Sequence, residues 1–125
     1  MAQKTVLIVD DDLDFSSMLK EVLESEGLTV LVEHDGVSGV ARALEAKPDL
    51  VMCDFMMPRL SGVAALTQIR ADDWGKDVPA ILLTNMGATE ALGAAQANPG
   101  IPTKCLLKTD LTLDQIAANV KELLA

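Results

Sequence analysis

The chain has 125 residues, 50% of them hydrophobic and only 2% aromatic, which suits one compact domain with a core of aliphatic side chains. Its formal net charge of −9, from 10 basic and 19 acidic residues, argues against binding to nucleic acid or to an anionic membrane surface. Two cysteines, Cys53 and Cys105, are too few for a disulfide framework. The three aspartates at 10–12 come too early in the chain for a signal peptide, and no apolar run is long enough to span a membrane. We therefore expect a cytoplasmic protein.

The first half of the chain alternates short apolar runs with segments of helical period. Residues 6–9 are all apolar and rich in β-branched side chains, which is typical of a strand buried on both faces. Asp14 is the expected N-cap of the next helix, and Gly27 lies where that helix should end. A strand over 29–32 and a helix over 37–46 are predicted to follow.

The second half continues the same alternation. The predicted elements are, in chain order, a strand over 50–53, a helix over 62–71, a strand over 80–83, an Ala/Gly-rich helix over 88–97, a strand over 103–107, and a helix from about 112 to 124. Thr112 and Gln115 have the spacing of a capping box. Five strands alternating with five helices predict an α/β fold in which a parallel sheet has helices on both faces, with residues 1–125 as a single domain.

Polar residues follow the apolar strands, and in parallel sheets functional sites form at the carboxyl ends of the strands. These residues are Asp10, Asp11 and Asp12 after the first strand, Asp54 after the third, Thr84 after the fourth and Lys108 after the fifth. Clustered carboxylates repel one another unless a cation lies among them, and such oxygen ligands suit Mg²⁺ better than Zn²⁺. A carboxylate beside a metal can act as a nucleophile on a phosphoryl group, whose oxygens a lysine then neutralises.

Each of these residues also has an ordinary structural explanation. The acidic run at 10–12 would alone suit a solvated turn, Asp54 a loop or cap, Thr84 a strand end and Lys108 a surface position. If there were no functional site, every one of these ordinary explanations would have to be true at the same time, and each at the end of a strand. We therefore favour the phosphoryl-transfer hypothesis, and we assign no role to His34, an expected exposed loop residue.

At this point the sequence resembles the receiver domains of two-component response regulators over essentially its whole length. The resemblance rests on four motifs in the right order: VLIVDDD at 6–12, DLVMCDFMMPRLSG at 49–62, ILLTN at 81–85 and CLLKTDL at 105–111. It implies a doubly wound, flavodoxin-like sheet with strand order 2-1-3-4-5. It also implies a signalling domain, not an enzyme, that a sensor histidine kinase or a histidine phosphotransfer protein phosphorylates on Asp54.

The resemblance further implies the roles of the other site residues. Asp11 would bind Mg²⁺ directly together with Asp54 and the backbone carbonyl of Met56, and Asp10 would act through water. Thr84 and Lys108 would contact the phosphoryl group, and Met56 and Met86 would flank the site. An unknown output protein would read the face formed by the fourth helix, the fifth strand and the fifth helix.

Three residues depart from the family pattern. Thr109 replaces a proline that often follows a cis peptide bond, so we expect a trans bond there. Cys105 replaces an aromatic switch residue, and Asn85 occupies a position where a small residue is frequent and where it is expected to crowd the phosphate. Thr109 and Asn85 keep open a pseudo-receiver that binds partners without phosphorylation. A small aspartyl-phosphate hydrolase is disfavoured, because no cap domain or second catalytic base is visible.

Overall fold

The computed structural model describes residues 3–85 and 103–125, so Met86 and the predicted helix over 88–97 lie outside the described residues. The helices and strands are β1 (Thr5–Val9), α1 (Leu13–Ser25), β2 (Thr29–Glu33), α2 (Gly36–Ala46), β3 (Leu50–Asp54), α3 (Gly62–Arg70), β4 (Ala80–Thr84), β5 (Lys104–Leu107) and α5 (Leu113–Leu124). Two short 3₁₀ helices, η1 (Trp74–Lys76) and η2 (Lys108–Asp110), complete the described elements. Within this part of the chain, no helix has the length and apolar character needed to cross a membrane.

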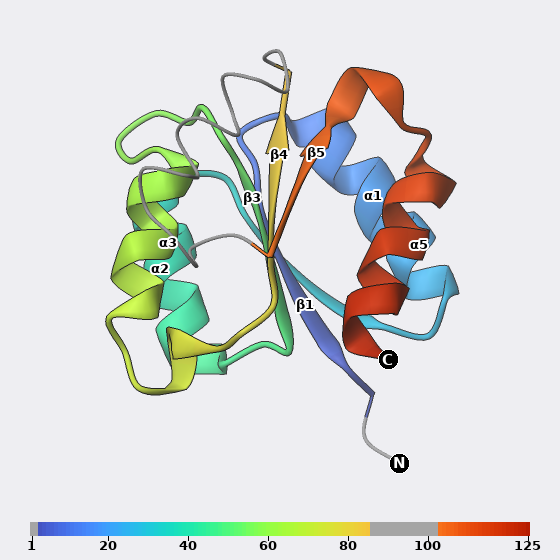
Figure 1. Cartoon of the computed structure of the whole chain (residues 1–125). Helices are drawn as coiled ribbons and strands as arrows, with labels where there is room; N and C mark the ends of the chain where they lie inside the picture. Colours follow the sequence, from blue (N-terminus) through green and yellow to red (C-terminus); the bar gives the residue numbers. More distant parts are fainter. Residues whose placement is uncertain (1–2, 86–102) are drawn as a thin grey trace.

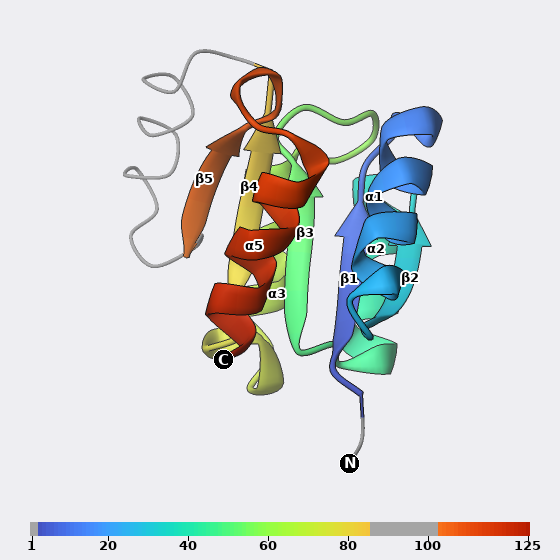
Figure 2. The ribbon, with the colours of Figure 1, turned by 90° about the vertical axis from the view of Figure 1, so that its right-hand side faces the viewer.

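The five strands form one sheet in the order β2-β1-β3-β4-β5, and every neighbouring pair is parallel. Helices α2 and α3 cover one face of this sheet, whereas α1 and α5 cover the other (Figure 1). Turned by 90°, the view shows the strand order across the sheet with α1 and α5 in front (Figure 2). The predicted α/β class, the doubly wound sheet and the strand order are therefore confirmed.

Alternating side chains of the strands supply both cores. On β1, Val6 and Ile8 pack with buried residues of α1 and α5, such as Leu19. Leu7, the residue between them, packs with buried residues of α2 and α3, such as Val40. Because both faces of the strand are covered, its apolar run shows no polar alternation, as expected for a parallel sheet. The same arrangement brings the carboxyl ends of all strands to one edge of the molecule.

The helix boundaries confirm two predicted signals and correct one. Gly27 has a φ of 85° just after α1, and Thr112 forms a complete capping box at the start of α5. Asp14 was predicted to cap α1, but the N-cap is Asp12, whose Oδ1 accepts a hydrogen bond from Phe15 N at 3.0 Å. The reason is that Asp12 keeps an extended backbone beyond the strand, so that its carboxylate reaches the free N–H groups of the first turn.

Candidate acidic pocket and family

The strand ends bring three carboxylates together at the edge of the sheet. Asp10 follows β1, Asp54 ends β3, and these two strands are neighbours in the sheet. One carboxylate oxygen each from Asp10, Asp11 and Asp54 lies within 4.8 Å of the other two. Asp10 is fully buried and Asp54 is 7% exposed, whereas Asp11 is open to solvent. The structure thus places this acidic cluster where the sequence predicted it.

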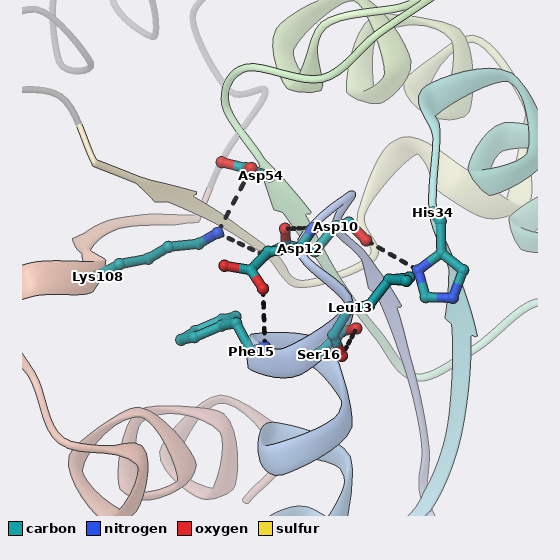
Figure 3. Close-up of polar contacts among 8 residues, drawn as sticks. All are labelled: Asp10, Asp12, Leu13, Phe15, Ser16, His34, Asp54 and Lys108. Carbon is teal, nitrogen blue, oxygen red and sulfur yellow. Dashed lines mark hydrogen bonds and ion pairs between the residues drawn. The ribbon is translucent and has the colours of Figure 1, made fainter.

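Lys108 follows β5, the edge strand of the sheet, and its side chain reaches this cluster. Its Nζ lies 2.6 Å from Asp10 Oδ2 and 3.4 Å from Asp54 Oδ2, and its side chain is 7% exposed (Figure 3). Neighbouring strands lie about 4.8 Å apart, so β5 is roughly 10 Å from β3, and only a long side chain bridges that gap. The described residues contain no cis peptide bond, so Lys108 takes this position with a trans bond before Thr109, as expected.

Asp10 is held on both of its carboxylate oxygens. Oδ1 accepts a hydrogen bond from Asp12 N at 2.9 Å, and Oδ2 faces the Lys108 ammonium. Although Oδ2 has no hydrogen bond of good geometry, the ion pair with Lys108 is short, and we regard it as the interaction that compensates this buried charge. The contacts with Lys108 and Asp12 therefore fix the orientation of Asp10.

A hollow of about 320 Å³ opens beside these groups. Its lining residues are Asp11, Asp12, Asp54, Met56, Thr84, Asn85 and Lys108. At about 30 Å³ per water molecule, the hollow has room for roughly ten waters, enough for a hydrated cation with a phosphoryl group. Asp10 lies beneath the lining, and the fully buried Thr84 and the exposed Asn85 form part of its wall.

The charges of the pocket suit a cation. Burial and, after it, the nearby negative charge of Asp10 raise the pKa of Asp54, the ammonium of Lys108 lowers it, and the pKa that results is about 6. Among the described residues, this cluster holds three carboxylates, and the ammonium of Lys108 pairs with two of them, Asp10 and Asp54. A divalent ion with oxygen preference would relieve the remaining repulsion. The donor set therefore fits Mg²⁺, as predicted from the sequence.

Two contacts at this site were not anticipated from the sequence. Lys108 Nζ lies 4.5 Å from the centroid of the Phe15 ring, and His34 Nδ1 lies 3.1 Å from the Asp10 carbonyl oxygen. His34 is exposed, as expected, but it has a polar partner. Both contacts join residues far apart in the sequence, so no local sequence pattern predicts them.

The sequence from residue 6 to residue 116 matches the model of the response regulator receiver domain. This chain is a member of the response regulator receiver domain family. Curated relatives include the transcriptional regulatory protein CpxR of Klebsiella pneumoniae, 41% identical over 66% of this chain and 34% of that protein. The response regulator MprA of Mycobacterium ulcerans is 31% identical over 95% of this chain and 49% of that protein.

Solved structures agree in fold. The chemotaxis response regulator CheY4 of Vibrio cholerae has a TM-score of 0.88 at 24% identity, covering 98% of this chain and 99% of that one. The receiver domain of the sensor histidine kinase PA1611 from Pseudomonas aeruginosa, solved with a magnesium ion in its active site cleft, has a TM-score of 0.83 at 24% identity, covering 98% of both chains. At this identity the likeness concerns the fold alone.

The family assignment fixes the general role of the chain. It is a receiver domain of two-component signalling, and such domains are signalling domains, not metabolic enzymes. The chain spans about a third of CpxR and about half of MprA, so it corresponds to one part of these longer proteins.

Proposed function

We propose that this domain is a phosphoacceptor switch that takes a phosphoryl group onto Asp54 with the help of Mg²⁺. The observation that carries this proposal is the convergence of Asp54, two further aspartates, Thr84 and Lys108 at one polar hollow. The phosphodonor would be a sensor histidine kinase or a histidine phosphotransfer protein in the cytoplasm. Residues 1–125 would form a single receiver domain.

Asp54 is the nucleophile in this mechanism. One of its carboxylate oxygens attacks the phosphorus of a phosphohistidine, the P–N bond breaks, and the departing imidazole takes up a proton. Negative charge develops on the equatorial oxygens of the transferred group. The Lys108 ammonium, 3.4 Å from Asp54 before the reaction, is placed to neutralise this charge, and the Thr84 hydroxyl in the wall can donate to another oxygen. The domain assists only this transfer and its own dephosphorylation.

The metal would lie on the open side of the acidic cluster. Asp11, Asp54 and the Met56 carbonyl are the residues that would hold it, with Asp10 acting through water because it lies beneath the lining. When bound, the ion would supply positive charge that reduces the repulsion among the carboxylates and polarises the phosphoryl oxygens. No other group in the described part of the chain offers a comparable cluster of oxygen ligands.

Phosphorylation would add up to two negative charges at the end of β3. We propose that Thr84 and Lys108 respond and that the face of the fourth helix, β5 and α5 carries the change to an output protein or to an attached output domain. Of that face, the structure describes β5 and α5. Since Cys105 stands where the family often has an aromatic ring, the readout would not depend on rotation of such a ring.

Incubation with Mg²⁺ and acetyl phosphate tests the proposal, with intact mass as the readout. We expect one added phosphoryl group, which chelation of the metal prevents and which Asp54→Asn, a variant of nearly equal size, does not acquire. Absence of any addition, in conditions that label a known receiver, would overturn the proposal. The pseudo-receiver would then be the better explanation, because Asn85 does line the hollow.

A further inference from the structure

The Phe15 ring faces the ammonium of Lys108, and Phe15 has no role in the chemistry above. Its ring centroid lies 4.5 Å from Lys108 Nζ, well within the range in which an aromatic face attracts a cation. The ring comes from the first turn of α1, whereas Lys108 follows β5, so the contact joins two segments that lie far apart in the sequence (Figure 3). Phe15 also packs against the buried cluster between the sheet, α1 and α5.

A closed circuit of contacts links Phe15 to Asp12, Asp10 and Lys108. Phe15 N donates to Asp12 Oδ1 at 3.0 Å, and Asp12 N in turn donates to Asp10 Oδ1 at 2.9 Å. Lys108 Nζ returns to the other oxygen of Asp10, at 2.6 Å. Each member therefore touches two others, so the position of Phe15 is tied to that of Asp10.

This circuit supplies a restraint that the segment after Lys108 lacks. Thr109 does not have the fixed φ of a proline, so it restrains the backbone next to Lys108 less than a proline would. The carboxylates of Asp10 and Asp54 also attract the ammonium. The Phe15 ring adds attraction from α1, and because it carries no net charge it does so without competing for Mg²⁺.

We propose that Phe15 is a positioning residue that holds the Lys108 ammonium where it meets the phosphoryl group. The proposal rests on the phosphoacceptor function, since it gives Lys108 that task. The proposed effect is the electrostatic attraction between the face of the ring and the ammonium, and not only the volume that the ring fills. Leucine at this position should therefore fail where tryptophan succeeds, because tryptophan has the stronger attraction for a cation.

The test compares Phe15→Leu and Phe15→Trp with the unaltered protein. A matched control is Val120→Ala, which removes apolar contacts from the same buried cluster at α5 without touching Lys108. At saturating Mg²⁺ and acetyl phosphate, we expect Phe15→Leu to be phosphorylated roughly three- to tenfold more slowly. Phe15→Trp and Val120→Ala should remain within about twofold of the unaltered protein. Equal rates for the unaltered protein and Phe15→Leu, or equal slowing in Val120→Ala, would overturn the proposal.

A second readout does not depend on phosphorylation. Protons on the Lys108 stem above an aromatic face are shifted upfield in NMR spectra, and this shift should vanish in Phe15→Leu and persist in Phe15→Trp. If the unaltered protein takes up no phosphate, the phosphoacceptor function fails, but the NMR shift still decides whether the ring holds the ammonium. A Lys108 spectrum that is identical in the unaltered protein and Phe15→Leu would overturn the positioning role.

Discussion

Asp54 is buried beside like charge, and its ionisation therefore acts on stability as well as on reactivity. Its pKa is raised to about 6 in the folded protein, first by burial and then by Asp10, against an ordinary value of 3.8. Between these two values the folded state binds more protons than the unfolded state, so stability falls as the pH rises. The unfavourable contribution is absent below about pH 4 and complete above about pH 6.

Asp54→Asn should relieve this strain in metal-free buffer. We expect the variant to match the unaltered protein near pH 4 and to be more stable above pH 7, by on the order of 1–3 kcal/mol. Denaturant unfolding can be followed through Trp74, the single tryptophan, which packs against the cluster on the α2 and α3 face. The exposed Glu21→Gln serves as the control for loss of one negative charge. A stability difference that is the same at every pH would contradict the assignment.

At the scale of elements, the amino terminus of α3 is pressed against the end of β3. An added Cβ at Gly62 would collide with the Asp54 carbonyl oxygen and would lie 2.9 Å from Leu82 Cδ2. Gly62 N also donates to the Phe55 carbonyl at 3.0 Å, which closes the loop that carries Met56. The absence of a side chain at this position therefore helps to place both the nucleophile and the expected metal ligand.

Gly62→Ala should displace the end of β3 and weaken the site. We expect a loss of about 1–3 kcal/mol in unfolding free energy, together with weaker Mg²⁺ binding by calorimetry. Gly27→Ala is the matched control, because its φ of 85° makes alanine costly by about 1–2 kcal/mol although nothing lies within 4 Å. That variant should bind Mg²⁺ normally. Equal Mg²⁺ affinities for the two variants would show that α3 does not position the site.

Sequence reasoning located the elements and the strand-end residues because both depend on local patterns. An apolar run with a polar residue after it marks a buried strand and its end, as at Asp54. The order of the strands came from the resemblance, since periodicity does not state which strands are neighbours. The cap of α1 was misplaced by two residues, because Asp12 and Asp14 are equally good capping residues and only the backbone path chooses between them. The contact between Phe15 and Lys108 depends on the tertiary fold, which brings the residue after β5 close to the first turn of α1, and no local pattern encodes it.

For the whole molecule, the order of the strands decides which groups meet. With β1 and β3 adjacent at the centre, the acidic residues that follow them share one site, and β4 and β5 add a hydroxyl and an ammonium from one side. The chain as a whole carries a formal charge of −9, so negative charges repel one another over the molecule as well as within the acidic cluster. Cations can therefore stabilise the protein in two ways, by screening the general charge and by binding at the site.

Comparing salts at matched ionic strength separates these two effects. A ligand that binds only the folded state at 100 times its Kd adds about 2.7 kcal/mol, so Mg²⁺ at that level should raise Tm by several degrees more than NaCl does. The gain should shrink near pH 5. Asp54, with a pKa of about 6, is then mostly protonated, and the proton competes with Mg²⁺ for the carboxylate. Asp11→Asn should lose most of the gain while keeping the response to NaCl, since it removes a ligand but barely alters the total charge. If NaCl and MgCl₂ raised Tm equally in thermal scans, Mg²⁺ would act only by screening charge, and the acidic cluster would not be a metal site.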